Sequence, residues 1–258
     1  MQRVAFWIRA SAGVAGFGIA VTWYAFTRLL PMSPGDRRQS FARLLGRLCC
    51  GAAGLRVRIV GQEHLLKHHP CVYVANHQSQ IDYPIAGLIF PGSAVVMGRQ
   101  VGDWPIIGPL YRGAENIALD RDVPVRAVAA LAQAERIIRE QKLSVWMFAE
   151  GTRGKVSGVL GPFKRGAFRL AGATGAPVVP VVISPLKPKT DLRARRLSRQ
   201  DVVVQVLEPV FAAGDTREDE DTLREEVRRR MQHALSGFLR KDAAEFASTK
   251  QAASAHTA

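Results

Sequence analysis

The segment CVYVANHQSQID, residues 71–82, sets the pattern for the whole chain. It opens with an apolar run that is typical of a buried strand, and this run stops abruptly at Asn76. A histidine, His77, follows at once, and an aspartate, Asp82, comes five residues later. A strand that ends in a polar turn with an imidazole and a carboxylate has the groups needed for general-base chemistry at a sheet edge. The two side chains can meet only if His77 lies in the turn and Asp82 opens a helix behind it.

The chemistry of such a pair is well defined, although pairs of histidine and aspartate also occur by chance in most proteins. A neutral imidazole can accept a proton from a hydroxyl, and a carboxylate bonded to its other nitrogen fixes the tautomer and stabilises the imidazolium that forms. The sequence has no Gly-x-Ser-x-Gly motif, and the histidines at 64, 68 and 69 come without other plausible metal ligands. We therefore expect no metal site, and we expect those histidines to lie in a polar loop.

The rest of the chain alternates between strand and helix patterns. Strands are expected at residues 55–59, 71–75, 94–97, 143–148, 177–183 and 202–210. Helices are expected at residues 83–90, 125–141, 163–173 and 222–239. This order predicts an α/β fold with a mixed, mostly parallel sheet flanked by helices. The expected regions are an N-terminal membrane-associated two-helix hairpin, the α/β domain, and a disordered tail of small polar residues, at 1–54, 55–242 and 243–258.

The N-terminal region is strongly apolar. From Ala10 to Thr27, 18 consecutive residues lack Asp, Glu, Lys and Arg, and as a helix they would extend roughly 27 Å, close to the bilayer core of about 30 Å. A cleaved signal peptide is the alternative, but no convincing small-x-small site is present. After a turn at residues 31–35, a second helical pattern has one apolar face and one basic face, with Arg37, Arg38, Arg43 and Arg47 on the basic face. Such a pattern is typical of a helix in an anionic membrane surface and also of a core-packed helix. We expect this hairpin to dip into or cross the membrane.

The composition predicts a basic surface. The 258 residues carry a formal net charge of +14, which favours phospholipid headgroups, nucleic acid or an acidic carrier protein as partners. Few aromatic residues interleave with the basic tracts and no nucleic-acid-binding motif is present, so we expect no nucleic-acid partner; salt-dependent binding to oligonucleotides would show otherwise. The cysteines, Cys49, Cys50 and Cys71, lack Cys-x-x-Cys spacing. They indicate neither a disulfide framework nor a zinc site, and they fit a reducing location.

Two further strand ends present polar groups. The segment VWMFAEGTRG, residues 145–154, runs from a strand into a loop with a carboxylate, a hydroxyl and a guanidinium. Glycine lets backbone N–H groups approach an anion, and the planar fork of arginine suits phosphate. Arg121 follows another apolar run, at residues 117–119, and supplies a second arginine. Each segment alone could be an ordinary surface turn.

Taken together in this order, the motifs resemble those of the glycerolipid acyltransferase superfamily, and most closely the bacterial 1-acyl-sn-glycerol-3-phosphate acyltransferases. Residues 76–82 match the first motif of that family, a histidine and an aspartate separated by four residues. The other motifs are similar to residues 98–121, to 148–153 continued by 163–168, and to 178–183. The sequence departs from the family pattern at Ala149, where proline is usual, at Gln100, where glutamate is frequent, and at Gly98 and Arg99, where a lysine pair is common.

The resemblance implies transfer of a fatty acyl group to the sn-2 hydroxyl of 1-acyl-sn-glycerol 3-phosphate, which makes phosphatidic acid in phospholipid biosynthesis. His77 would be the general base and Asp82 would orient it. The donor would be acyl-coenzyme A or an acyl-[acyl carrier protein], with no bound cofactor. Arg121 and Arg153 would bind the acceptor phosphate, Glu150 would position an arginine or the substrate, and Gly151 and Thr152 would shape the pocket.

The N-terminal hairpin and the cysteine usage lead us to expect a location at the inner (cytoplasmic) membrane, with the catalytic domain facing the cytoplasm. Candidate contacts for an acidic partner, either the anionic leaflet or a carrier protein, are Lys164, Arg165 and the basic run of Lys187, Lys189, Arg193, Arg195, Arg196 and Arg199. Two alternatives stay open for the reaction. The acceptor could be another lysolipid, such as a lyso-ornithine lipid, or His77 and Asp82 could serve a hydrolase of acyl esters that uses water as the acceptor.

Overall fold

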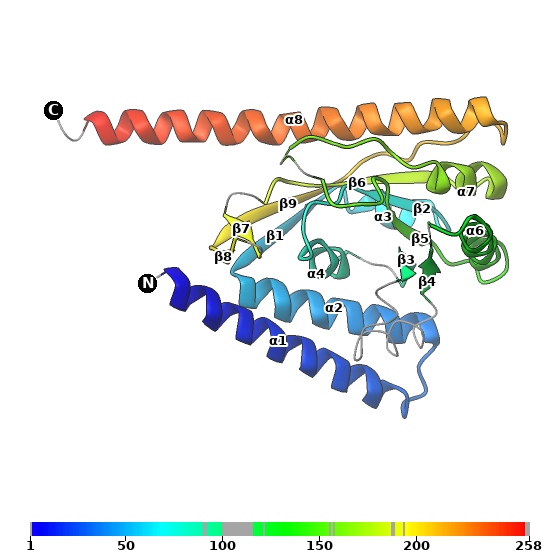
Figure 1. Ribbon diagram of the computed structural model, residues 1–258, viewed down its shortest axis with the longest axis horizontal. Coiled ribbons are helices and arrows are strands. Elements are labelled where there is room, and N and C mark those ends of the chain that lie inside the picture. The colour runs from blue at the N-terminus through cyan, green and yellow to red at the C-terminus, as the bar shows by residue number, and fades with distance from the viewer. Residues whose placement is uncertain are drawn as a thin grey trace.

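In the part of the chain that the structure describes, a seven-stranded sheet forms the centre (Figure 1). The computed structural model describes residues 2–89, 92–99, 116–120, 122–154, 156, 158–186, 189–192 and 194–255. In sheet order, the strands are β1 (Leu55–Val60), β9 (Gln200–Val206), β6 (Val178–Ile183), β2 (Val72–Ala75), β5 (Val145–Phe148), β3 (Ala94–Gly98) and β4 (Ile117–Leu119).

The strands from β6 to β4 all run in the same direction, whereas β9 pairs antiparallel with β6 and parallel with β1. The mixed, mostly parallel sheet predicted from the sequence is therefore confirmed. Every residue of the central β2 is buried, while β1 alternates between the core and solvent, as an edge strand does. Because parallel strands share the edge at which they end, the segments after β6, β2, β5, β3 and β4 all start from one edge of the sheet.

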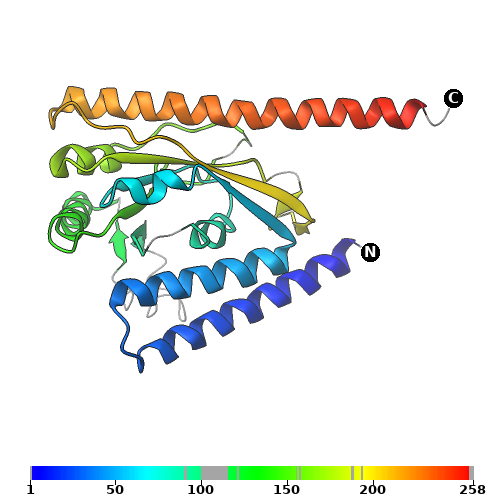
Figure 2. The ribbon, with the colours of Figure 1, turned by 180° about the vertical axis from the view of Figure 1, so that it is seen from behind.

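Helices cover both faces of the sheet (Figures 1 and 2). One face packs against α6 (Pro124–Arg139), α7 (Gly166–Thr174) and α8 (Arg217–Ala255). The other packs against α4 (Asp82–Gly87) and α2 (Pro34–Ala53), with α1 (Gln2–Thr27) as the outermost layer. The short α3 (Glu63–Lys67) adds Leu65 to this second core. Tyr73 and Ala75 of β2 lie on the second face. Because side chains two residues apart along an extended chain point to the same face, His77 projects toward α4 and the N-terminal helices.

The predicted N-terminal hairpin is present. Ser33 caps α2 by accepting a hydrogen bond from the Asp36 N–H at 3.1 Å, and α2 ends at Gly54, whose φ of +78° favours glycine. Along the hairpin, the indole N–H of Trp23 on α1 donates to the Ser40 hydroxyl at 2.6 Å. α1 is long and apolar enough to cross a membrane by length and composition.

The basic face of α2 is not fully exposed to solvent. Arg38 was expected on that face, yet it is buried, with 6% exposure. On the sheet side α2 touches α4 through glycines: a Cβ at Gly46 would lie 2.7 Å from the Pro84 carbonyl oxygen, and one at Gly87 would lie 2.4 Å from that of Ala42. The hairpin also shares one hydrophobic core with the sheet, to which it contributes Phe6, Cys50 and Ala53. The structure therefore favours the core-packed interpretation of α2.

Two segments have more regular structure than the sequence predicts. A disordered tail was expected from residue 243, whereas α8 continues to Ala255 and extends past the sheet in Figure 1. Alanines are frequent after residue 243, and alanine favours helix even where the amphipathic pattern has ended. For the basic segment between β6 and β9 the sequence predicts neither a strand nor a helix, whereas its described residues include a small hairpin of β7 (Thr190–Asp191) and β8 (Arg196–Leu197).

Candidate active site

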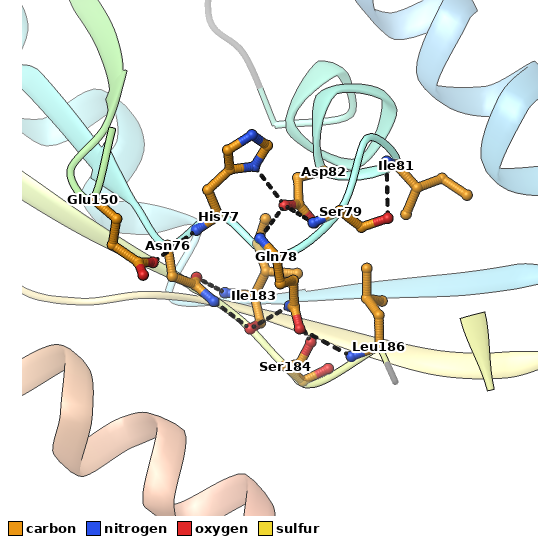
Figure 3. A network of polar contacts seen from close by, with 10 residues as sticks. All are labelled: Asn76, His77, Gln78, Ser79, Ile81, Asp82, Glu150, Ile183, Ser184 and Leu186. Atoms are coloured by element: carbon orange, nitrogen blue, oxygen red, sulfur yellow. Dashed lines mark hydrogen bonds and ion pairs between the residues drawn. The ribbon is translucent and has the colours of Figure 1, made fainter. Parts of the chain in front are cut away.

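His77 and Asp82 meet immediately after β2 (Figure 3). The Nδ1 atom of His77 lies 2.7 Å from Oδ2 of Asp82. The same Oδ2 accepts the backbone N–H groups of Gln78 at 2.6 Å and Ser79 at 2.8 Å, so this carboxylate also holds the turn together. Asp82 is the first residue of α4 and is fully buried. The predicted geometry, with the histidine in the turn and the aspartate opening the helix, is confirmed.

This contact determines which nitrogen of His77 can act on a substrate. An ionised carboxylate only accepts hydrogen bonds, so Nδ1 carries the proton that His77 donates to Asp82. In a neutral imidazole, Nε2 is then the nitrogen with a free lone pair. His77 retains 8% exposure, which leaves part of the ring accessible. The pair is therefore arranged to accept a proton at Nε2 while Asp82 stabilises the positive charge on the ring.

Two aromatic rings hold the imidazole in place, and neither was anticipated from the sequence. Phe148, the last residue of β5, stacks on His77 with ring centroids 4.2 Å apart and an interplanar angle of 21°. Tyr83 meets His77 edge-on at 5.5 Å and Phe148 at 5.2 Å. The stacking of Phe148 follows from the strand register, because Phe148 pairs with Ala75, and Ala75 lies two residues before His77 on the same face of the sheet. That register becomes available only once the strand partners are known.

Side-chain amides on either side of His77 tie the turn to the end of β6. Asn76 donates to the Ile183 carbonyl at 3.0 Å and accepts from the Ile183 N–H at 2.8 Å, which continues the ladder between the two strands. Gln78 donates to the Ser184 carbonyl at 2.9 Å and accepts from the Leu186 N–H at 3.1 Å. The residues on both sides of His77 are thus hydrogen-bonded to the end of β6 and to the segment that follows it. Figure 3 shows this network.

Glu150 has backbone partners. Its Oε1 accepts the N–H of His77 at 3.1 Å, and its Oε2 accepts the N–H of Gly161 at 2.9 Å. The side chain is buried, with 5% exposure. The sequence led us to expect that Glu150 positions an arginine or the substrate, and that role stays a prediction. Among the described residues, both carboxylate oxygens accept backbone N–H groups, one of them from His77.

The loop after β5 carries the other expected binding residues. Gly151 has a φ of +72°, a conformation that suits glycine, and Thr152 and Arg153 that follow are exposed. In the described part of the chain, no carboxylate lies within ion-pair distance of Arg153. Arg121, the second expected arginine, lies outside the described residues, as do Gln100 and residues 101–115 of the second motif.

Asp120, just before Arg121, is described. It accepts hydrogen bonds from Arg126 at 2.9 Å and from Arg99 at 3.3 Å. The hydrogen bond from Arg126, helped by the other contacts, keeps the pKa of Asp120 below its usual value. An ionised Asp120 therefore holds arginines at the shared edge of the sheet.

The chain belongs to a known family by sequence. A family model described as acyltransferase matches residues 56–184. A 1-acyl-sn-glycerol-3-phosphate acyltransferase from Salmonella typhimurium is 34% identical over 172 residues, which cover 66% of this chain and 69% of the relative. The protein is a member of the acyltransferase family.

Other relatives of this acyltransferase span bacteria and a eukaryote. The Escherichia coli protein of the same name is 34% identical over the same shares of both chains, and that of Saccharomyces cerevisiae is 33% identical over 70% of this chain and 60% of the relative. The crystal structure of the 1-acyl-sn-glycerophosphate (LPA) acyltransferase PlsC from Thermotoga maritima matches 90% of this chain and 94% of that chain, with a TM-score of 0.70 and 22% identity. That likeness supports the fold.

The thiol of Cys71 does not qualify as the nucleophile of this acyltransferase. It is fully buried next to Ser144, and burial raises its pKa to about 11. A thiol with such a pKa is protonated at neutral pH and is a poor nucleophile. In the described part of the chain, no group of three or more His, Cys, Asp or Glu side chains is arranged to hold a metal ion. The groups assembled at the His77 turn are those of a general base.

The basic residues expected to contact an acidic partner have different surroundings in the structure. Arg165 pairs within the chain, with Glu220 at 2.5 Å and Asp221 at 3.4 Å, both in the first turns of α8. Lys164 is exposed. Lys187 and Arg193 lie outside the described residues, whereas the other basic side chains of that segment are exposed: Lys189, Arg195, Arg196 and Arg199.

Proposed function

We propose that this acyltransferase moves a fatty acyl group from an acyl thioester to the sn-2 hydroxyl of 1-acyl-sn-glycerol 3-phosphate and so makes phosphatidic acid. The observation that carries the proposal is the buried His77–Asp82 pair at the sheet edge, in a chain whose curated relatives are named for this reaction. The donor is acyl-coenzyme A or an acyl-[acyl carrier protein]. No bound cofactor is needed, because the acyl group passes directly from sulfur to oxygen.

The reaction needs one proton to move twice. The Nε2 atom of His77 takes the proton of the sn-2 hydroxyl as its oxygen attacks the thioester carbonyl, and the Asp82 carboxylate stabilises the imidazolium that results. The C–O bond forms and the C–S bond breaks. The leaving thiolate then takes from His77 the proton that came from the hydroxyl. No acyl-enzyme is required. A hydrolase would use the same groups with water, so the acceptor must be bound firmly enough to compete with water.

We assign Arg153 to the acceptor phosphate; of the two arginines expected there, it is the one that lies in the described part of the chain. It is exposed in the loop after β5, and Gly154 behind it donates to the His77 carbonyl at 2.7 Å, which links this loop to the catalytic turn. We expect Arg153→Ala to raise the KM for lysophosphatidate by roughly 10- to 100-fold, because a charge-assisted hydrogen bond contributes about 1.5–3 kcal/mol. The KM for the acyl donor should stay unchanged. Steady-state kinetics test this, with Arg169→Ala on α7 as the exposed control; an unchanged KM for lysophosphatidate would remove Arg153 from the phosphate site.

The headgroup preference follows from the same assignment. A site that binds phosphate with arginine should reject neutral lysolipids. Lipid mass spectrometry, after the purified protein has been incubated with an acyl donor and a panel of lysolipids, tests this preference. Phosphatidate should form fastest. A faster conversion of lyso-ornithine lipid would assign the enzyme to that acceptor instead.

We place the enzyme at the inner membrane, with its catalytic domain facing the cytoplasm and α1 lying in the membrane surface. One side of α1 packs along α2, where Gly16 contacts Leu48. The other side exposes large apolar residues to the surroundings: Val4, Trp7, Ile8, Val14, Ile19 and Phe26. A helix with one packed and one exposed apolar side suits the boundary between headgroups and acyl chains. Since His77 projects toward this side of the sheet, α1 would bring lipid substrate to the catalytic face.

The basic β7–β8 hairpin continues the same surface. The guanidinium of Arg195 lies 5.8 Å from the ring centroid of Trp7, and Arg9 donates to the Leu197 carbonyl at 2.5 Å. The exposed Arg195 beside the exposed Trp7 fits an anionic leaflet, where each basic residue contributes about 1 kcal/mol. An acidic carrier protein is the other partner with suitable charge.

Membrane binding gives a test of this arrangement. We expect replacement of Trp7, Ile8 and Val14 by serine to lower partitioning into anionic vesicles by more than roughly tenfold, because burying each large apolar side chain contributes about 1.5–3 kcal/mol. Vesicle sedimentation measures the effect. The matched control is Val125→Ser with Val128→Ser, two exposed valines on α6, which packs on the opposite face of the sheet. Equal sedimentation of both variants would rule out α1 as the attachment surface.

A further inference from the structure

A loop from Gly158 to Gly161 lies between Glu150 and the C-terminal helix. On its inner side, the Gly161 N–H donates to Oε2 of Glu150 at 2.9 Å. The fit is close, because a Cβ at Gly161 would lie 2.9 Å from that oxygen. Leu160, between these glycines, is buried in the core that the sheet shares with α8. The loop is therefore a packed element that touches the carboxylate holding His77.

On its outer side, the loop is bonded to α8 through two half-buried polar side chains. Gln232 accepts the Leu160 N–H with its Oε1 at 3.2 Å. Arg228, one turn earlier, points its guanidinium at the carbonyls of Leu160 and Gly161, each at 3.4 Å. The buried Val227, Met231 and Leu235 hold this stretch of α8 against the domain, so Gln232 and Arg228 present fixed partners to the loop.

The contacts form a continuous path from α8 to the catalytic histidine. Gln232 bonds to Leu160, Gly161 bonds to Glu150, and Glu150 bonds to the backbone N–H of His77. The His77 carbonyl is held by the same chain segment, through the N–H of Gly154 at 2.7 Å. Both backbone polar groups of His77 are thus fixed by residues 150–161. The acyltransferase family model matches residues 56–184, so α8 lies outside the segment that this model covers.

We propose that Gln232 and Arg228 are positioning residues for the acyl-transfer reaction: from α8 they fix the loop that fixes Glu150, and Glu150 fixes the backbone of His77. The expected effect on kcat rests on the proposed function, because it presupposes that His77 is the general base. A general base works only when its nitrogen lies within about 3 Å of the proton that it takes. A small displacement of a catalytic group can lower a rate by up to about 100-fold even when the mutated residue is remote.

The test replaces Gln232 by leucine, which keeps a helix-forming side chain of similar length but leaves the Leu160 N–H without its acceptor. We expect kcat to fall by roughly tenfold while the KM values for lysolipid and acyl donor change less than about twofold. Gln232→Glu keeps an acceptor oxygen for Leu160 and should restore kcat. His233→Leu, the exposed neighbour on the same helix turn, is the control and should behave as the wild type.

Hydrogen exchange gives a readout that does not depend on activity. In Gln232→Leu, the amides of His77 and Gly161 should exchange faster, because their shared partner Glu150 is less well held. They should keep wild-type rates in Gln232→Glu and His233→Leu. Wild-type exchange at His77 together with wild-type kcat in Gln232→Leu would overturn the proposal. If the wild-type protein transfers no acyl group, the proposed function fails, and the exchange rates still decide whether α8 positions His77.

Discussion

Replacing His77 by alanine is expected to lower the rate of acyl transfer by roughly 10²- to 10⁴-fold, the usual contribution of a positioned general base. The hydroxyl of the acceptor would then have to lose its proton to water. The turn should survive the change, because Asp82 still accepts the N–H groups of Gln78 and Ser79, and Glu150 still accepts the N–H of residue 77. The effect should therefore appear in kcat, with the protein folded and membrane binding unchanged.

The control for this variant is another histidine of the chain. His69 is exposed and lies before β2, at the end of the strand opposite to His77, where its Nδ1 is 2.8 Å from the Ser144 hydroxyl. His69→Ala should keep near-normal transfer. Kinetics with a radiolabelled acyl thioester, together with thermal unfolding of each variant, separate loss of the base from loss of the fold. Near-normal transfer by a folded His77→Ala protein would show that this side chain is not the base.

Asp82→Asn is expected to have the second large effect, a fall in kcat of roughly 10²- to 10⁴-fold. An asparagine oxygen can still accept the hydrogen bonds that Oδ2 of Asp82 receives from His77, Gln78 and Ser79. What it removes is the negative charge that stabilises the imidazolium. The change should therefore lower kcat with little effect on the KM values, since an interaction made mainly in the transition state is lost.

The same variant should also be less stable. Asp82 is fully buried, and its Oδ2 accepts three hydrogen bonds, from His77, Gln78 and Ser79. A neutral amide oxygen accepts these bonds more weakly than a carboxylate does, at a cost of about 1–3 kcal/mol in the free energy of unfolding. Asp201→Asn, at an exposed ion pair with Arg56, is the control. A wild-type kcat in Asp82→Asn would mean that the charge of Asp82 has no part in the reaction.

The fold and the first motif could be predicted because they depend on local patterns. Short apolar runs that end in polar turns mark buried parallel strands, and the spacing from His77 to Asp82 suits one turn followed by a helix start. The direction of the strands then brings polar residues from several loops to the same edge. These properties follow from hydrophobic periodicity and from the geometry of parallel sheets.

What the sequence did not reveal depends on which segments pack together. The stacking of Phe148 on His77 follows from the pairing of β2 with β5, and the burial of Arg38 follows from the placement of α2 between α1 and α4. The backbone partners of Glu150 come from two segments far apart in the chain. No local pattern encodes such contacts. The role of Arg121 stays a prediction, because that residue lies outside the described part of the chain.

Acyl transfer by this enzyme is tested most directly by following the label from an acyl thioester in the presence of the purified enzyme and 1-acyl-sn-glycerol 3-phosphate. The label should appear in phosphatidate, with one thiol released for each acyl group transferred, and His77→Ala should abolish most of this product. Label that accumulates as free fatty acid, at the same rate with or without the lysolipid, would show that the acceptor is water and would identify a hydrolase.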